Sequence, residues 1–60
     1  MSEKALAERI RLLAHEVRAL SHRGQLKWGD DLDAIAEEVY EQRDWSEKRF
    51  KWYRGEVQQL

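Results

Sequence analysis

Residues 2–23 decide the fold of this chain, and they read SEKALAERIRLLAHEVRALSHR. Their large apolar residues recur in alternating steps of four and three, which is the heptad spacing of a helix that packs along one seam. Isoleucine and valine take the a positions and leucine takes the d positions, a combination that favours paired helices. We therefore expect one helix over residues 2–23, with a dimer seam made of Leu6, Ile10, Leu13, Val17 and Leu20.

The ends and the flanks of this helix refine its interpretation. Ser2 is the expected N-cap, and Gly24 stands where a helix-ending glycine belongs. Three heptads followed by glycine are too short for a long zipper, so one side of the helix is expected to pack on its own chain. The small residues beside the seam, Ala7, Ala14 and Ser21, are then expected to lie open to a second chain.

The rest of the chain predicts two more helices. Residues 25–29 form an expected connector bounded by glycines, and a helix follows over about 30–43, where either of two aspartates can cap it. A third helix is expected over 44–60, because Asp44 and Glu47 have the spacing of a capping box. The predicted fold is all-α: a helical hairpin plus a third helix, forming a small, dimeric three-helix bundle in one domain, residues 1–60.

Length and composition narrow the function classes. Sixty residues bury a small core, and such domains are usually stabilised by disulfides, a metal or oligomerisation. The chain has no cysteine, and its two histidines are seven residues apart, so we expect no metal, no cofactor and a homodimer. No nucleophile–base pair or phosphate loop is present, so we expect no enzyme. No apolar run of membrane length and no leader pattern is present, so we expect a cytoplasmic protein without membrane contact.

The third helix carries most of the aromatic residues. Phe50, Tyr53, Val57 and Leu60 form one stripe with Trp45 and Trp52 beside it. The combined arc spans about 160°, against roughly 100° for an ordinary core-facing helix. One interpretation is that all of these rings belong to the core. The other is that part of the face binds a partner protein, because tryptophan, tyrosine and arginine are enriched at binding hot spots. The candidate partner-binding residues are Trp45, Arg49, Trp52 and Tyr53.

Charge is unevenly distributed along the chain. Residues 1–23 carry five basic and three acidic side chains, 24–44 carry two and seven, and 45–60 carry four and two. The last segment suggests nucleic-acid contact through a helix-turn-helix, with Lys48, Lys51 and Arg54 as candidates. The pI near 6.1 and the acidic segment favour the alternative, a solvated basic face. The acidic segment itself is a solvated face, a surface for a basic partner, or a mimic of a nucleic-acid backbone.

Residues 19–50 resemble part of a bacterial helical family known as domain of unknown function twenty-nine. The likeness is carried by Gly24–Leu26, by Leu32 with Ile35–Val39, and by Ser46–Arg49. The spacing of Trp45, Arg49 and Trp52–Arg54 is similar to that of small negative regulators of AraC-type activators. Both resemblances imply a small helical protein of bacterial, phage or plasmid origin, and neither assigns a functional residue.

Together these features predict a small non-enzymatic regulator that acts as a homodimer and binds and modulates a larger bacterial protein through helix packing. The alternative is a nucleic-acid-binding regulator that uses the third helix.

Overall fold

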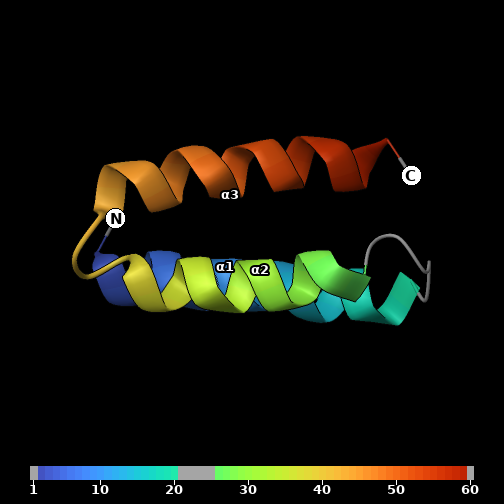
Figure 1. Ribbon diagram of the computed structural model, residues 1–60, viewed down its shortest axis with the longest axis horizontal. Helices are drawn as coiled ribbons and strands as arrows, with labels where there is room; N and C mark the ends of the chain where they lie inside the picture. Colours follow the sequence, from blue (N-terminus) through green and yellow to red (C-terminus); the bar gives the residue numbers. More distant parts are fainter. Residues whose placement is uncertain (1, 21–25, 60) are drawn as a thin grey trace.

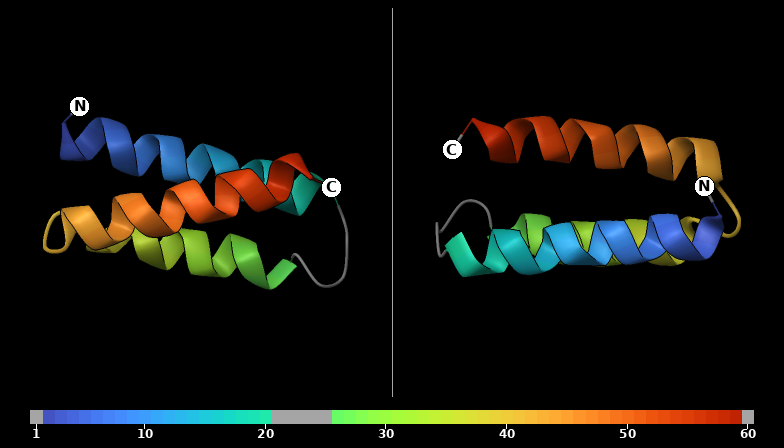
Figure 2. Two further views of the ribbon diagram at one scale, coloured as in Figure 1. Left: turned by 90° about the horizontal axis from the view of Figure 1, so that it is seen from above. Right: turned by 180° about the vertical axis from the view of Figure 1, so that it is seen from behind.

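The computed structural model describes residues 2–20 and 26–59, which form three helices. α1 spans Glu3–Leu20, α2 spans Leu26–Glu38 and α3 spans Arg43–Gln58. Consecutive helices are antiparallel, so α1 and α3 point the same way (Figure 1). α1 and α2 lie beside each other in one layer, and α3 covers the pair (Figures 1 and 2). The all-α, three-helix prediction is confirmed for the described residues.

α1 begins as its sequence predicts. The Oγ of Ser2 accepts a hydrogen bond from the backbone N–H of Ala5 at 3.2 Å, which satisfies one of the free donors at the helix start. The predicted end near Arg23, the glycine stop at Gly24 and the small residue Ser21 lie outside the described residues.

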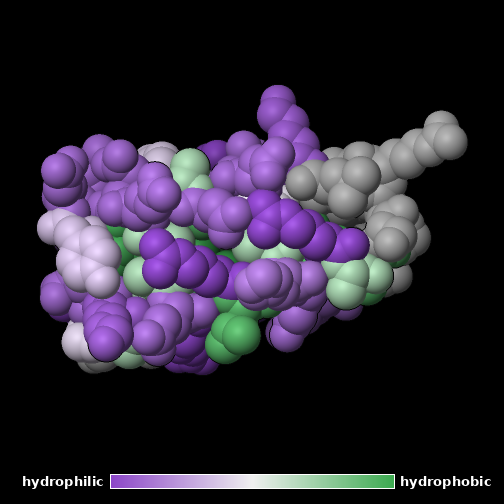
Figure 3. Space-filling view, turned by 90° about the horizontal axis from the view of Figure 1, so that it is seen from below, coloured by the Kyte–Doolittle hydropathy of each residue, from purple (hydrophilic) through white to green (hydrophobic). Residues whose placement is uncertain are grey.

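The core is built from one apolar stripe on each helix. Each fully buried Leu, Ile, Val or Phe contributes about 1.5–3 kcal/mol relative to an exposed one, so this stripe is the main stabilising feature. The outer face of the α1–α2 layer is mostly hydrophilic (Figure 3), so these two helices bury apolar side chains mainly on the opposite face, toward the core. The buried apolar residues are Leu6, Ala7, Ile10, Leu13, Ala14, Val17, Leu32, Ile35, Ala36, Val39, Phe50 and Tyr53.

α2 begins four residues earlier than predicted. The expected connector over 25–29 is wrong for Leu26–Gly29, which belong to the helix, and the expected start at Asp30 falls inside its second turn. Position 29 favours glycine for a steric reason, because a Cβ there would lie 2.9 Å from the Nε of Arg18. The glycine therefore allows an α1 side chain to cross closely over α2 and does not end a helix.

Asp30, one of the two aspartates expected to cap α2, instead joins the helices together with Asp33. The guanidinium of Arg18 in α1 donates to Asp30 at 3.0 Å and to Asp33 at 2.7 Å in α2. These hydrogen bonds, the one to Asp33 first, raise the pKa of Arg18 above its ordinary value. Part of the acidic segment thus fastens α2 to α1, which leaves Glu37 and Glu41 as exposed carboxylates of that segment.

α2 also ends earlier than predicted, at Glu38, and α3 starts at Arg43. The predicted capping box of Asp44 and Glu47 is wrong, because the N-cap residue is Gln42 and no side chain hydrogen-bonds to the helix start. The register of α3 on α2 is set by Ser46, which is fully buried and donates its hydroxyl to the carbonyl oxygen of Ile35 at 3.2 Å. A small side chain there lets the two backbones approach closely.

Candidate partner-binding surface

A row of large side chains lies on the outer face of α3. Trp45, Arg49 and Trp52 are spaced four and three residues apart, which places them on one side of the helix. Trp45 is 45% exposed, Trp52 is 53% exposed and Arg49 is also exposed. The guanidinium carbon of Arg49 lies 6.0 Å from the ring centroid of Trp45 and 5.8 Å from that of Tyr53. This arginine therefore connects two rings through cation–π contacts.

α2 contributes a further ring, Trp28, that sequence reasoning missed. Its ring centroid lies 6.0 Å from that of Trp52 and 5.6 Å from that of Tyr53, both in edge-to-face geometry. The signal was present in the sequence, because Trp28 is in helical phase with Leu32 and Ile35. The expected connector over residues 25–29 hid that phase.

Tyr53 has a different role from the one predicted. It is only 4% exposed, so it belongs to the core rather than to a contact surface. Its hydroxyl donates to a carboxylate oxygen of Asp31 at 3.0 Å. Burial, and next this hydrogen bond, raise the pKa of the Tyr53 phenol above its ordinary value. The neutral phenol fastens α3 to α2, and its ring lies 4.9 Å from that of Trp52, which it supports from beneath.

Four side chains therefore make one continuous surface across α2 and α3, which we call the aromatic–arginine surface: Trp28, Trp45, Arg49 and Trp52. Trp28 and Trp52 contact each other and Tyr53, and Trp45 is contacted by Arg49, so these side chains have less freedom to lose on binding. Large, rigid amphipathic side chains of this kind dominate the energetics of protein–protein interfaces. The described residues contain no group of three or more His, Asp or Glu side chains placed to hold a metal ion.

The predicted dimer seam lies inside the single chain. Leu6, Ile10, Leu13 and Val17 are buried in its core, and Leu20 is 40% exposed at the end of α1. The small residues Ala7 and Ala14, predicted to lie open to a second chain, are also buried, so that prediction is wrong. The reason is that α2 packs against α1 along this side, and small residues let it approach closely.

The candidate nucleic-acid contacts neighbour one another along α3: Lys51 and Arg54 line one hollow, and Lys48 and Lys51 line another. Lys48 is exposed on α3, Lys51 pairs with Glu47 at 3.3 Å, and Arg54 lies over the ring of Phe50 at 5.6 Å. α2 and α3 run antiparallel, whereas a helix-turn-helix crosses its two helices at about 90–120°. Residues 26–59 therefore do not form that motif.

No protein-family model, no curated protein and no solved structure matches this chain. The two family resemblances noted in the sequence accordingly stay predictions. Among the described helices, none combines the length and the apolar character that crossing a membrane requires.

Proposed function

We propose that this protein is a small, non-enzymatic interaction module that binds and modulates a larger bacterial protein through the aromatic–arginine surface. The observation that carries this proposal is the exposure of Trp45 and Trp52 on the same face of α3. A chain of 60 residues needs its large apolar side chains for its own core. Leaving two tryptophans about half exposed therefore gives up folding free energy, which a function at that surface would explain.

The surface also has the composition of a binding hot spot. Tryptophan and arginine are enriched where truncation weakens binding most. Arg49 has its guanidinium beside the ring of Trp45, so its charge is presented at the edge of an apolar patch. A partner with an apolar groove and a carboxylate at its rim would match this arrangement.

Self-association through the predicted dimer seam of α1 is not part of this proposal. Four of the five seam residues are already buried within one chain, so they have no surface left for a second chain. The module we propose acts as a monomer toward its partner, in a reducing cytoplasm.

The test is affinity capture from the source organism with the wild-type chain, followed by titration of the purified captured protein. Trp45→Gln combined with Trp52→Gln should weaken binding at least about thirtyfold, since loss of a hot spot costs about 2 kcal/mol or more. Arg49→Gln should also weaken it. The matched control is Arg11→Gln, the same change at an exposed arginine of α1 that does not belong to the surface.

Equal affinity of the double tryptophan variant and the wild type would remove the proposal. Circular dichroism of each variant has to show an intact helical fold, so that a loss of binding reports on the surface itself.

A further inference from the structure

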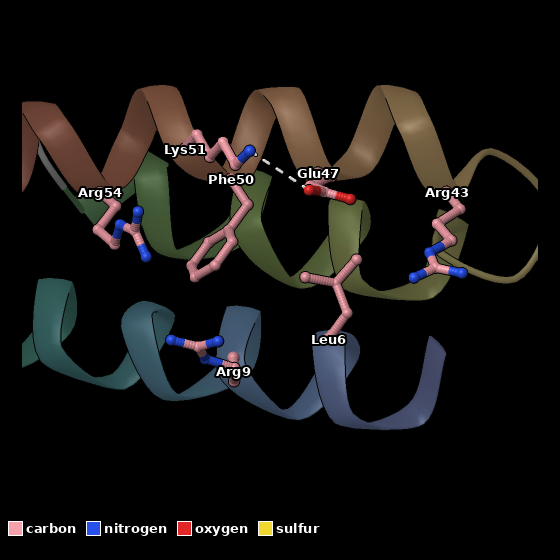
Figure 4. Close-up of a pocket in the computed structure, with 7 residues that line it drawn as sticks. All are labelled: Leu6, Arg9, Arg43, Glu47, Phe50, Lys51 and Arg54. Atoms are coloured by element: carbon pink, nitrogen blue, oxygen red, sulfur yellow. Dashed lines mark ion pairs between the residues drawn. The ribbon is translucent and has the colours of Figure 1, made fainter. Parts of the chain in front are cut away.

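A second concave region lies on the other side of α3, between α1 and α3. It consists of two adjoining hollows of about 180 and 290 Å³, which share Arg9, Phe50 and Arg54 as lining residues. Phe50 forms the floor of both hollows, with Leu6 and Leu13 from α1 beside it. Figure 4 shows Arg54 descending from α3 beside this ring and Arg9 lying on α1 below it. We call this region the α1–α3 groove.

The groove is basic at its rim. Its lining includes four cationic side chains, Arg9, Arg43, Lys51 and Arg54, and two carboxylates, Glu16 and Glu47. Glu47 already pairs with Lys51 at 3.3 Å, and Arg43 pairs with Glu3 of α1 at 3.3 Å. Within the described part of the chain, Arg54 forms no ion pair; its guanidinium lies over the ring of Phe50. With Glu3 counted, four cations face three carboxylates, so the rim holds a small net positive charge above an apolar floor.

One lip of the groove is apolar and exposed. Leu12 lines the second hollow and is 62% exposed, compared with 40% for Leu20 at the end of the same helix. It stands on α1 close to the arginines that line the same hollow. An occupant that contacts this lip must therefore bring apolar as well as anionic groups.

We propose that the α1–α3 groove binds an acidic amphipathic α-helix of a partner protein. Such a helix would lie along α1 and α3 as a fourth helix of the bundle, its apolar stripe on Phe50 and Leu12 and its carboxylates toward Lys51 and Arg54. α1 and α3 have 18 and 16 residues, so a helix of about 16 residues, roughly 24 Å long, matches the groove. This site is separate from the aromatic–arginine surface and does not rest on the function proposed for it.

Two other occupants fit the groove less well. A second copy of this chain would have to supply its acidic α2, but the apolar residues of that helix, Leu32, Ile35 and Val39, are buried in its own core. A nucleic acid would use the positive charge but not the apolar floor.

The test uses synthetic probes and fluorescence anisotropy. The probe is a labelled helical peptide of about 16 residues, with leucine at positions i, i+3, i+4 and i+7 and glutamate at the exposed positions. Its partner probe has lysine in place of every glutamate, and the third probe is a random DNA duplex. We expect the glutamate peptide to bind in the micromolar range and the lysine peptide to bind at least tenfold more weakly.

Variants assign that binding to the groove. Arg54→Glu and Leu12→Asp should each weaken the glutamate peptide about fivefold or more, and the affinity should fall as salt is raised. Arg11→Glu, the same charge reversal outside the groove, should leave it unchanged. Trp45→Gln combined with Trp52→Gln should also leave it unchanged, which separates this site from the aromatic–arginine surface.

Several results would overturn the inference. Absence of glutamate-peptide binding, equal binding of the lysine peptide, or equal weakening by Arg54→Glu and Arg11→Glu would each do so. Displacement of the peptide by the DNA duplex, with the steeper salt dependence of phosphate contacts, would make the groove a nucleic-acid site instead. Dimerisation of the chain that blocks the peptide would assign the groove to a second copy.

Discussion

Truncation of the outer tryptophans should cost far less folding stability than truncation of the core ring next to them. Phe50 is 6% exposed and lies among core side chains, so Phe50→Ala should cost about 3–5 kcal/mol. A domain of this size has about 3–5 kcal/mol in total, so we expect that variant to be largely unfolded. Trp45 and Trp52 share the helix with Phe50, and they differ from it mainly in exposure.

For Trp45→Ala the loss is smaller. Half-burial of the indole contributes about 1 kcal/mol, and the contact with Arg49 adds about 0.5–1 kcal/mol. Alanine returns about 0.5 kcal/mol because it is the better helix former. The net cost is about 1–1.5 kcal/mol, a drop in Tm of roughly 4–12 °C. Trp52→Ala should cost about 2 kcal/mol, since it also loses edge-to-face contacts with Trp28 and Tyr53.

The assay is urea and thermal unfolding followed by circular dichroism at 222 nm, with Leu12→Ala as the control for an exposed apolar residue. The expected order of cost is Leu12, Trp45, Trp52 and then Phe50. If Trp45→Ala unfolds the chain as completely as Phe50→Ala, the indole is part of the core, and the partner surface loses its basis.

Three further outcomes follow from particular contacts. Gly55→Ala should raise the free energy of unfolding by about 1 kcal/mol, because a Cβ there meets nothing within 4 Å. Gly29→Ala should raise it less, since the new Cβ displaces the Arg18 side chain. In an Arg18→Ala background, Gly29→Ala should raise it by the full amount. Because the pKa of Tyr53 is raised in the folded state, folding favours its neutral phenol: that stabilisation is complete below about pH 10 and is lost as pH rises further. Urea titrations between pH 8 and 11 should therefore show a smaller loss of stability for Tyr53→Phe than for the wild type, and identical slopes would contradict the burial. Sedimentation at micromolar concentration should show a folded monomer, and a dimer would mean that a surface other than the buried seam associates.

Sequence periodicity was sufficient for the number of helices and for the core of α1. The seam residues Leu6, Ile10, Leu13 and Val17 are buried as their spacing requires, because a helix with a strict apolar stripe has one way to cover it. Whether a stripe is covered by the same chain or by another is a tertiary question. The spacing of α1 is compatible with both answers, and here α2 and α3 cover it.

The start of α2 was mispredicted for a tertiary reason. Gly29 followed by Asp30 has the local chemistry of a turn and a cap, but both residues are placed to receive Arg18 from α1. That contact spans residues far apart in the chain and leaves no local signal. The candidate site shows the same limit: four aromatic side chains of α3 form a broad apolar arc, and only packing divides them into the buried Phe50 and Tyr53 and the exposed tryptophans.

The most direct test of the partner surface is a ¹⁹F NMR spectrum of the chain labelled with 5-fluorotryptophan, recorded free and bound to the captured partner. The three tryptophans give three resonances, assigned by single substitution to phenylalanine. We predict that the resonances of Trp45 and Trp52 shift and lose their solvent-isotope effect when the partner binds. A bound spectrum in which both keep their free positions and their solvent-isotope effects would contradict the account.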